Sequence, residues 1–172
     1  MRFEIKHQFD YPLETVEKAM FDPNFFPFLL EKHGVLLEVE PQERNETESE
    51  IRRKVRYRPK PVIESIGPKK VPPEWFAFVE ESTFNKKAHS VTFVNVPTTG
   101  KIRSMLMNKG SVSLREVAPG KTERVTQGEL QLILPFLLKP LAAIGERVIH
   151  SEAVKLLDAE ARVLREYISK QG

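Results

Sequence analysis

Apolar and polar residues alternate along the first segment of the chain. The mostly apolar set comprises Phe3, Ile5, His7, Phe9 and Tyr11, and every residue between them is polar or charged. A period of two predicts a strand with one buried face. Pro12 ends this strand and suits the first turn of a helix. Two short helices are therefore predicted over 13–21 and 25–32, and the second ends before Gly34.

The middle of the chain predicts six more strands, because alternating runs are separated there by polar turns. The predicted ranges are 35–40, 48–58, 75–85, 90–96, 107–117 and 123–134. Predicted turns lie at 42–46, 86–88 and 118–121. The loop before Trp75 has a proline density that excludes a helix and disfavours a central strand. Its prolines are Pro59, Pro61, Pro68, Pro72 and Pro73.

One long helix is predicted at the end of the chain, because apolar residues recur there every three or four positions. They are Leu137, Leu138, Leu141, Ile144, Val148, Ile149, Leu156, Leu157, Leu164 and Ile168. Pro140 predicts an irregular first turn, and Gly145 predicts a point of close approach to another element. Strands closed by one amphipathic helix bury their apolar face against it, so residues 1–172 are expected to form a single α+β domain.

Three segments, together with the order of elements, carry a resemblance to a known fold. They run from Phe9 to Pro12, from Phe21 to Pro23 and from Gly128 to Leu132. The chain resembles the helix-grip fold of the START-like (SRPBCC) superfamily, which includes lipid-transfer, pollen-allergen-like, coenzyme Q-binding and polyketide cyclase domains. It looks closest to a bacterial branch whose function is unassigned. The resemblance implies a curved, seven-stranded antiparallel sheet (β-α-α-β6-α) around a long C-terminal helix.

The resemblance also implies a cavity between the sheet and the last helix. Small-molecule cavities hold roughly 300–1,000 Å³, so the leading hypothesis is binding or carriage of a lipid or other hydrophobic small molecule, without a cofactor. The residues expected to line this pocket are His7, Phe28, Arg53, Val55, Tyr57, Met105, Leu141, Gly145 and Val148. A pattern of elements transfers no catalytic residue, so none is predicted.

Basic residues concentrate in one part of the chain. Eight Lys or Arg residues lie between Ile51 and Lys70 against the single acid Glu64, although the net charge is only +3. One hypothesis is peripheral contact with an anionic membrane or another polyanion through a basic strand face and nearby loops. The candidates are Arg52, Lys54, Arg56, Arg58, Lys60, Lys101 and Arg103. The alternative is a solvated face whose cations pair with neighbouring carboxylates, namely Glu46, Glu48, Glu50 or Glu81.

Three further features have two interpretations each. Arg53 either binds the carboxylate or phosphate of an amphipathic ligand, with Tyr57 nearby, or is structural, pairing with a core carboxylate or lying at the exposed end of the strand. His7 is either an acid–base group or a hydrogen-bonded core residue. The segment from Lys101 to Lys109 either forms a lid or membrane-touching loop, or begins the next strand.

Composition and motifs exclude several classes of function. The chain has no cysteine and its four histidines are dispersed, so no metal site is expected. Phosphate-loop, nucleophile-elbow and dinucleotide motifs are absent. With neither an apolar leader nor a run of about 20 apolar residues, we expect a cytoplasmic protein.

Two alternatives to a binding protein remain. The first is a cyclase, dehydratase or isomerase that uses a pocket acid or base, for instance His7 with Tyr57 or Glu80. The second is nucleic-acid binding by the basic strand, which we rank third. Single-stranded nucleic acids need aromatic stacking platforms, and Tyr57 is predicted to point to the opposite face.

Overall fold

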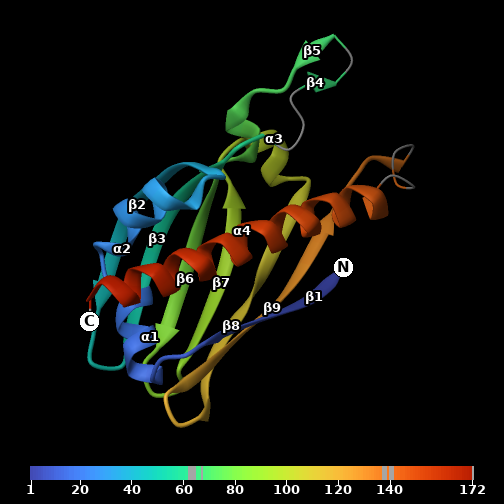
Figure 1. The fold of residues 1–172 in the computed structure, drawn as a ribbon. Helices are drawn as coiled ribbons and strands as arrows, with labels where there is room; N and C mark the ends of the chain where they lie inside the picture. The colour runs from blue at the N-terminus through green and yellow to red at the C-terminus, as the bar shows by residue number, and fades with distance from the viewer. Residues whose placement is uncertain (62–64, 67, 137–138, 140–141, 172) are drawn as a thin grey trace.

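One curved sheet wraps around one long helix (Figure 1). This computed structural model describes residues 1–61, 65–66, 68–136, 139 and 142–171. In chain order the elements are β1 (Arg2–Phe9), α1 (Leu13–Met20), α2 (Phe25–His33), β2 (Leu36–Glu46), β3 (Glu50–Pro59), β4 (Ser65–Ile66), β5 (Lys69–Lys70), the 3₁₀ turn η1 (Pro73–Phe76), β6 (Phe78–Asn85), β7 (Ser90–Pro97), α3 (Gly100–Arg103), β8 (Leu106–Ala118), β9 (Lys121–Leu132) and α4 (Ala142–Gln171).

The main sheet has seven strands in the order β1-β9-β8-β7-β6-β3-β2. Every pair of neighbours in it is antiparallel. The helix α4 crosses one face of this sheet, which we call the inner face, while the small β4–β5 ribbon projects beyond the sheet (Figure 1). The predicted α+β helix-grip architecture is therefore confirmed.

Two loops differ from the prediction. The proline-rich loop contains the turn η1, because Pro73 stands at its first position, where a helix does not use the backbone N–H. Trp75 belongs to this turn, so β6 begins only at Phe78. After β7 the chain forms the single turn α3, and β8 begins at Leu106.

The β2–β3 turn also differs from the prediction. β2 continues through the predicted turn at 42–46, since a bulge between Pro41 and Glu43 lets the pairing with β3 resume. The chain reverses instead at Thr47, whose backbone N–H donates to the carbonyl of Glu50 at 2.9 Å.

The last helix is buried only toward its C-terminal end. Its buried residues are Ala161, Val163, Leu164, Tyr167 and Ile168. The Tyr167 ring contacts Phe25 and Phe28 of α2 at centroid distances of 5.3 and 5.2 Å. The main core is formed by α1, α2 and this end of α4 packed on inner-face residues of the sheet such as Ile51 and Phe84. No residue from 142 to 160 is buried. The predicted irregular turn at Pro140 lies outside the described residues.

Two glycines let strands β8 and β9 approach each other closely. Gly110 pairs with Gly128 across the two strands. A Cβ atom on Gly110 would overlap the carbonyl oxygen of Gln127 and lie 2.9 Å from the Phe93 ring. A Cβ on Gly128 would overlap the ring of Phe3.

Among the described residues, no helix has the length and apolar composition that a membrane span requires.

Candidate functional site

A row of three polar side chains crosses the inner face of the sheet. Asn95 of β7 pairs in register with Glu80 of β6 on one side and with Asn108 of β8 on the other. Directly opposed side chains on one face of a sheet lie about 4.5–5.5 Å apart at Cβ. All three residues are half-buried. We call this set the inner polar row.

The two asparagines of the inner polar row have unusual side-chain oxygens. The side-chain oxygens of Asn95 and Asn108 are buried and have no hydrogen-bond partner among the described residues. The same holds for the hydroxyl oxygen of Thr126, on the inner face of β9. A buried polar group without a partner costs about 1–3 kcal/mol, so each such group in a native fold calls for an explanation.

Aromatic side chains lie beside the row on the same face. Tyr57 of β3 stacks on Phe78 of β6 with ring centroids 5.5 Å apart, and both side chains are half-buried. Burial raises the pKa of Tyr57 above its ordinary value, and the nearby Glu80 carboxylate raises it further, while Arg53 opposes the change. The Tyr57 hydroxyl therefore keeps its proton and can donate a hydrogen bond.

Arg53 lies on the inner face and is engaged by protein groups. Its Nε donates to the Ser82 hydroxyl at 3.2 Å, its Nη1 to the Met20 carbonyl at 3.3 Å, and its Nη2 lies 3.5 Å from Glu80. The guanidinium also lies over the Phe21 ring at 4.9 Å. These contacts join β3 to the end of α1, and they include the core carboxylate that one interpretation of the sequence anticipated.

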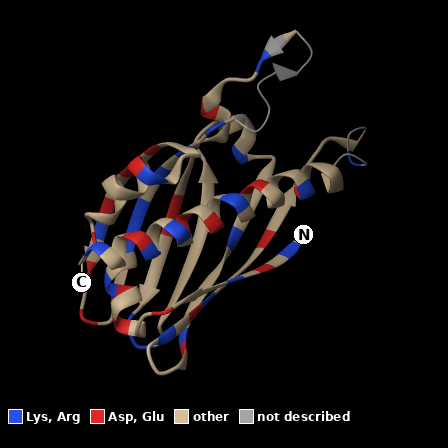
Figure 2. Ribbon diagram, viewed as in Figure 1, with Lys and Arg blue, Asp and Glu red and all other residues tan. Residues whose placement is uncertain are grey.

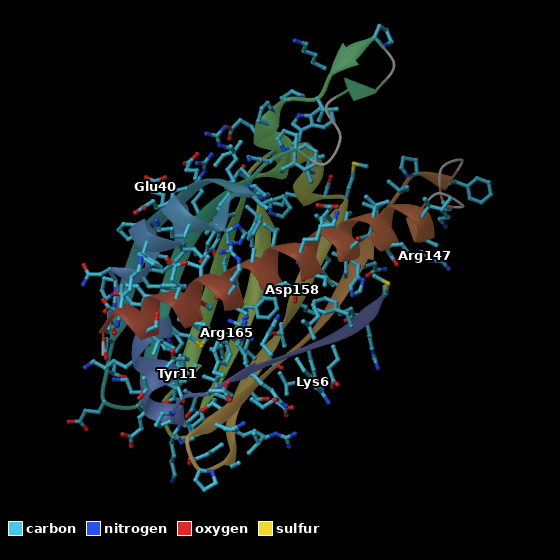
Figure 3. The ribbon with its side chains drawn as sticks, viewed as in Figure 1. Lys6, Tyr11, Glu40, Arg147, Asp158 and Arg165 are labelled. Atoms are coloured by element: carbon cyan, nitrogen blue, oxygen red, sulfur yellow. The ribbon has the colours of Figure 1, made fainter. Side chains whose placement is uncertain are left out.

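A second charged cluster joins β1 and β9 to α4. Arg124 is only 2% exposed and donates to Glu160 at 3.2 Å and to the Leu157 carbonyl at 3.5 Å. The bond to Glu160 comes from Nη1, whereas Nη2, which donates to Leu157, also lies 3.3 Å from Nδ1 of His7. The Nε2 of His7 lies 2.9 Å from Asp158. Asp158 is labelled near the middle of α4 in Figure 3. We call His7, Arg124, Asp158 and Glu160 the anchor network.

His7 uses both of its ring nitrogens within this network. Since Arg124 can only donate, Nδ1 of His7 accepts, and the proton stays on Nε2 facing Asp158. Burial lowers the pKa of His7 below its ordinary value and the Arg124 charge lowers it further, while Asp158 partly offsets both. The geometry is that of a hydrogen-bonded core histidine and leaves no ring nitrogen for a substrate.

The anchor network should make stability depend on pH. Burial also lowers the pKa of His33, so both histidines take up a proton more readily in the unfolded chain. The free energy of unfolding is thus expected to fall as the pH drops below about 6.5. In urea denaturation, His7→Gln should show a shallower fall than wild type, because glutamine mimics the neutral imidazole. An equally steep fall in the variant would remove His7 as a cause.

The remaining predicted pocket residues are dispersed. Val55 is 1% exposed on the inner face, whereas Phe28 packs on Tyr167 near the C-terminal end of α4. Val148 is 41% exposed, and Met105 follows α3 and is half-buried. Gly145 makes the predicted close approach, since a Cβ there would lie 2.6 Å from Leu132 of β9. Leu141 lies outside the described residues.

The four cations on the outer face of β3 are all paired with carboxylates. Arg52 lies 2.8 Å from Glu50, and Lys54 lies 3.7 Å from Glu81, two of the predicted partners. The two remaining arginines, Arg56 and Arg58, share Glu38 of β2 and Glu74 of η1. Figure 2 shows acidic segments beside the basic ones on these strands. The basic strand is thus locally neutralised.

The other surface candidates are separate from this strand. Arg103 is exposed and its Nε donates to the Pro97 carbonyl at 3.1 Å. Lys60 is exposed, and its backbone N–H donates to the Val35 carbonyl at 2.8 Å. The side chain of Lys101 lies outside the described part of the chain.

The described residues border at least two open hollows on the outer face of the sheet. One, of about 460 Å³, is bordered by Arg2, Lys109 and Glu129. The other, of about 810 Å³, is bordered by Arg52, Lys54 and Glu81. Both include Thr92 and Val94 of β7. They are the rival locations for a ligand.

Sequence reasoning missed Arg124, Asn95 and Asn108. The alternation of side chains along β7, β8 and β9 places each of them on the inner face. A polar residue at an otherwise apolar, inward position was the signal that could have identified them. Their grouping depends on the register between strands, which the sequence does not reveal. The pairing of His7 with Arg124 joins residues 117 positions apart.

A curved seven-stranded sheet closed by a long C-terminal helix is the helix-grip fold of the START-like superfamily, and the chain has this fold. It is similar in structure to TTHA0849 from Thermus thermophilus, with a TM-score of 0.65, 15% identity, and coverage of 95% of this chain and 97% of that one. No family model matches the sequence, and no curated protein matches it either.

Two further solved structures share the fold. The Zhui aromatase/cyclase from Streptomyces sp. R1128 is 12% identical with a TM-score of 0.65, covering 97% of this chain and 93% of that one. A START superfamily protein from Mycobacterium smegmatis is 11% identical with a TM-score of 0.55, covering 99% of both chains. At identities this low, the structural similarity shows that the fold is shared and nothing more.

Proposed function

We propose that this protein binds a largely apolar small molecule between the inner face of its sheet and the N-terminal half of α4. The observation that carries the proposal is the uneven packing of α4, whose buried residues all lie from Ala161 onward. The inner polar row and the half-buried rings of Tyr57 and Phe78 lie on the inner face of the sheet. Ligand sites are typically apolar surfaces with a few well-placed polar groups.

The polar groups of this region support binding more than acid–base catalysis. His7 has both nitrogens occupied, and Glu80 faces the Arg53 guanidinium. Tyr57 remains as a hydrogen-bond donor and not as a base. Membrane contact through the basic strand is not part of the proposal, because Arg52, Lys54 and their neighbours are paired with carboxylates.

Filling the space below α4 should abolish ligand binding without loss of stability. Ala153 is half-buried, and the helical period places it between His150, which contacts Phe3, and Leu157, which contacts Arg124. We expect purified wild-type protein to retain small molecules in native mass spectrometry, and Ala153→Phe to lack them. The matched control is Ala143→Phe, at an exposed position of the same helix.

Stability distinguishes a hollow from a packed interior. Adding even a few methylenes to a well-packed core costs about 1–3 kcal/mol, so a phenyl ring costs at least as much. If Ala153→Phe lowers the free energy of unfolding by that amount or more, and wild type retains no ligand, the interior is packed and the proposal is wrong. Unchanged stability with loss of the retained mass supports it.

A further inference from the structure

We propose that the inner polar row receives the hydroxyl end of a neutral ligand whose remainder is apolar. This inference rests on the proposed function and names the class of ligand. Glu80, Asn95 and Asn108 stand side by side on neighbouring strands, so they present one continuous polar strip. The strip lies on a face that also carries aromatic and aliphatic side chains, such as Phe78, Phe93 and Val112.

The hydrogen-bonding capacity of the row favours a group that both donates and accepts. A carboxylate such as Glu80 only accepts, whereas an asparagine amide accepts at its oxygen and donates at its nitrogen. The buried oxygens of Asn95 and Asn108 have no protein donor among the described residues. A ligand hydroxyl can donate to any of these oxygens and accept from an amide. An ether oxygen offers no donor.

The charges around the row disfavour an anionic ligand. Glu80 is matched by Arg53 at 3.5 Å, and Glu160 is matched by Arg124 at 3.2 Å. Arg53 also gives its other nitrogens to Ser82 and Met20. A ligand carboxylate placed on the row would meet Glu80 and two amide oxygens with no free cation among these groups. Like charges at such distances repel strongly away from water.

Three probes with the same ring system test this inference at neutral pH: naphthol, methoxynaphthalene and naphthoate, all substituted at the same ring position. We expect naphthol to bind wild type about tenfold more tightly than either of the others, as for one well-made hydrogen bond. Isothermal titration calorimetry measures the three dissociation constants. In Asn108→Leu, the preference for naphthol over methoxynaphthalene should fall to about twofold or less.

Two further variants keep the test independent of folding. Asn95→Leu should behave like Asn108→Leu, so either one suffices if the other does not fold. The matched control is Asn45→Leu, an exposed asparagine that borders the larger outer hollow and should keep the full preference.

The outcomes separate this inference from the function on which it rests. Equal binding of all three probes, or tightest binding of naphthoate, overturns the hydroxyl assignment while leaving ligand binding intact. Loss of the preference in Asn45→Leu, with its retention in both row variants, moves the site to the outer face and overturns the inference. Failure of all three probes to bind wild type counts against the proposed function itself.

Discussion

Replacing Arg124 with alanine is expected to lower the free energy of unfolding by about 3 kcal/mol, as for a buried ion pair that loses one partner. Arg124 is 2% exposed and reaches from β9 to His7, Glu160 and the Leu157 carbonyl. Removing the Arg124 side chain leaves a space between β9 and α4 and leaves Glu160 without the cation that it pairs with. Because Glu160 is 27% exposed, water limits the loss to the lower part of the range for such pairs.

Urea denaturation of Arg124→Ala and Lys121→Ala measures this effect with a matched control. Lys121 lies on the same strand and pairs with Asp10 at 3.3 Å, and the two side chains are 59% and 85% exposed. Exposed ion pairs contribute about 0–1 kcal/mol, so Lys121→Ala should be nearly neutral. Equal effects of the two substitutions would show that the anchor network does not hold α4 to the sheet.

A comparable loss is expected from Gly110→Ala, about 3 kcal/mol, the upper end of the usual cost of overpacking. The added Cβ would overlap the Gln127 carbonyl oxygen and lie 2.8 Å from the Cα of Gly128. Both neighbours are backbone atoms of β9, so relief requires the strands themselves to separate. The side chain of Phe93 adds a third contact at 2.9 Å.

Gly100→Ala is the control for Gly110→Ala. Nothing lies within 4 Å of a Cβ on Gly100, which is the first residue of α3. A surface substitution of this kind usually changes stability by no more than about 0.5 kcal/mol. Thermal or urea unfolding of both variants measures the difference. A stable Gly110→Ala protein would mean that β8 and β9 do not approach as closely as described.

The sequence predicted the order of the elements because each element depends on local patterning. Alternation over Phe3 to Phe9 predicted β1, and the stripe ending at Ile168 predicted α4. The predicted element boundaries were wrong where pairing between strands competed with local composition. Polar residues at 42–46 indicated a turn, but pairing with β3 extended β2 through them, and the turn moved to Thr47. Tertiary pairing outweighed local composition there.

The candidate site was less predictable, because it depends on which strands become neighbours. His7 and Arg53 were recognised as polar residues in inward positions, yet their partners Arg124 and Glu80 come from other strands. The inner polar row exists only because Glu80, Asn95 and Asn108 share one register across three strands. Alternation gives a residue's face, whereas its neighbours follow from strand order and register.

Binding of a small molecule between the sheet and α4 can be tested by locating a bound probe. With labelled methyl groups and naphthol in excess, intermolecular nuclear Overhauser effects report which methyl groups lie beside the ligand. Binding at this site predicts contacts to Val112 on the inner face and to Ala153 of α4. Contacts confined to Val94, which is 45% exposed and borders both outer hollows, would contradict it.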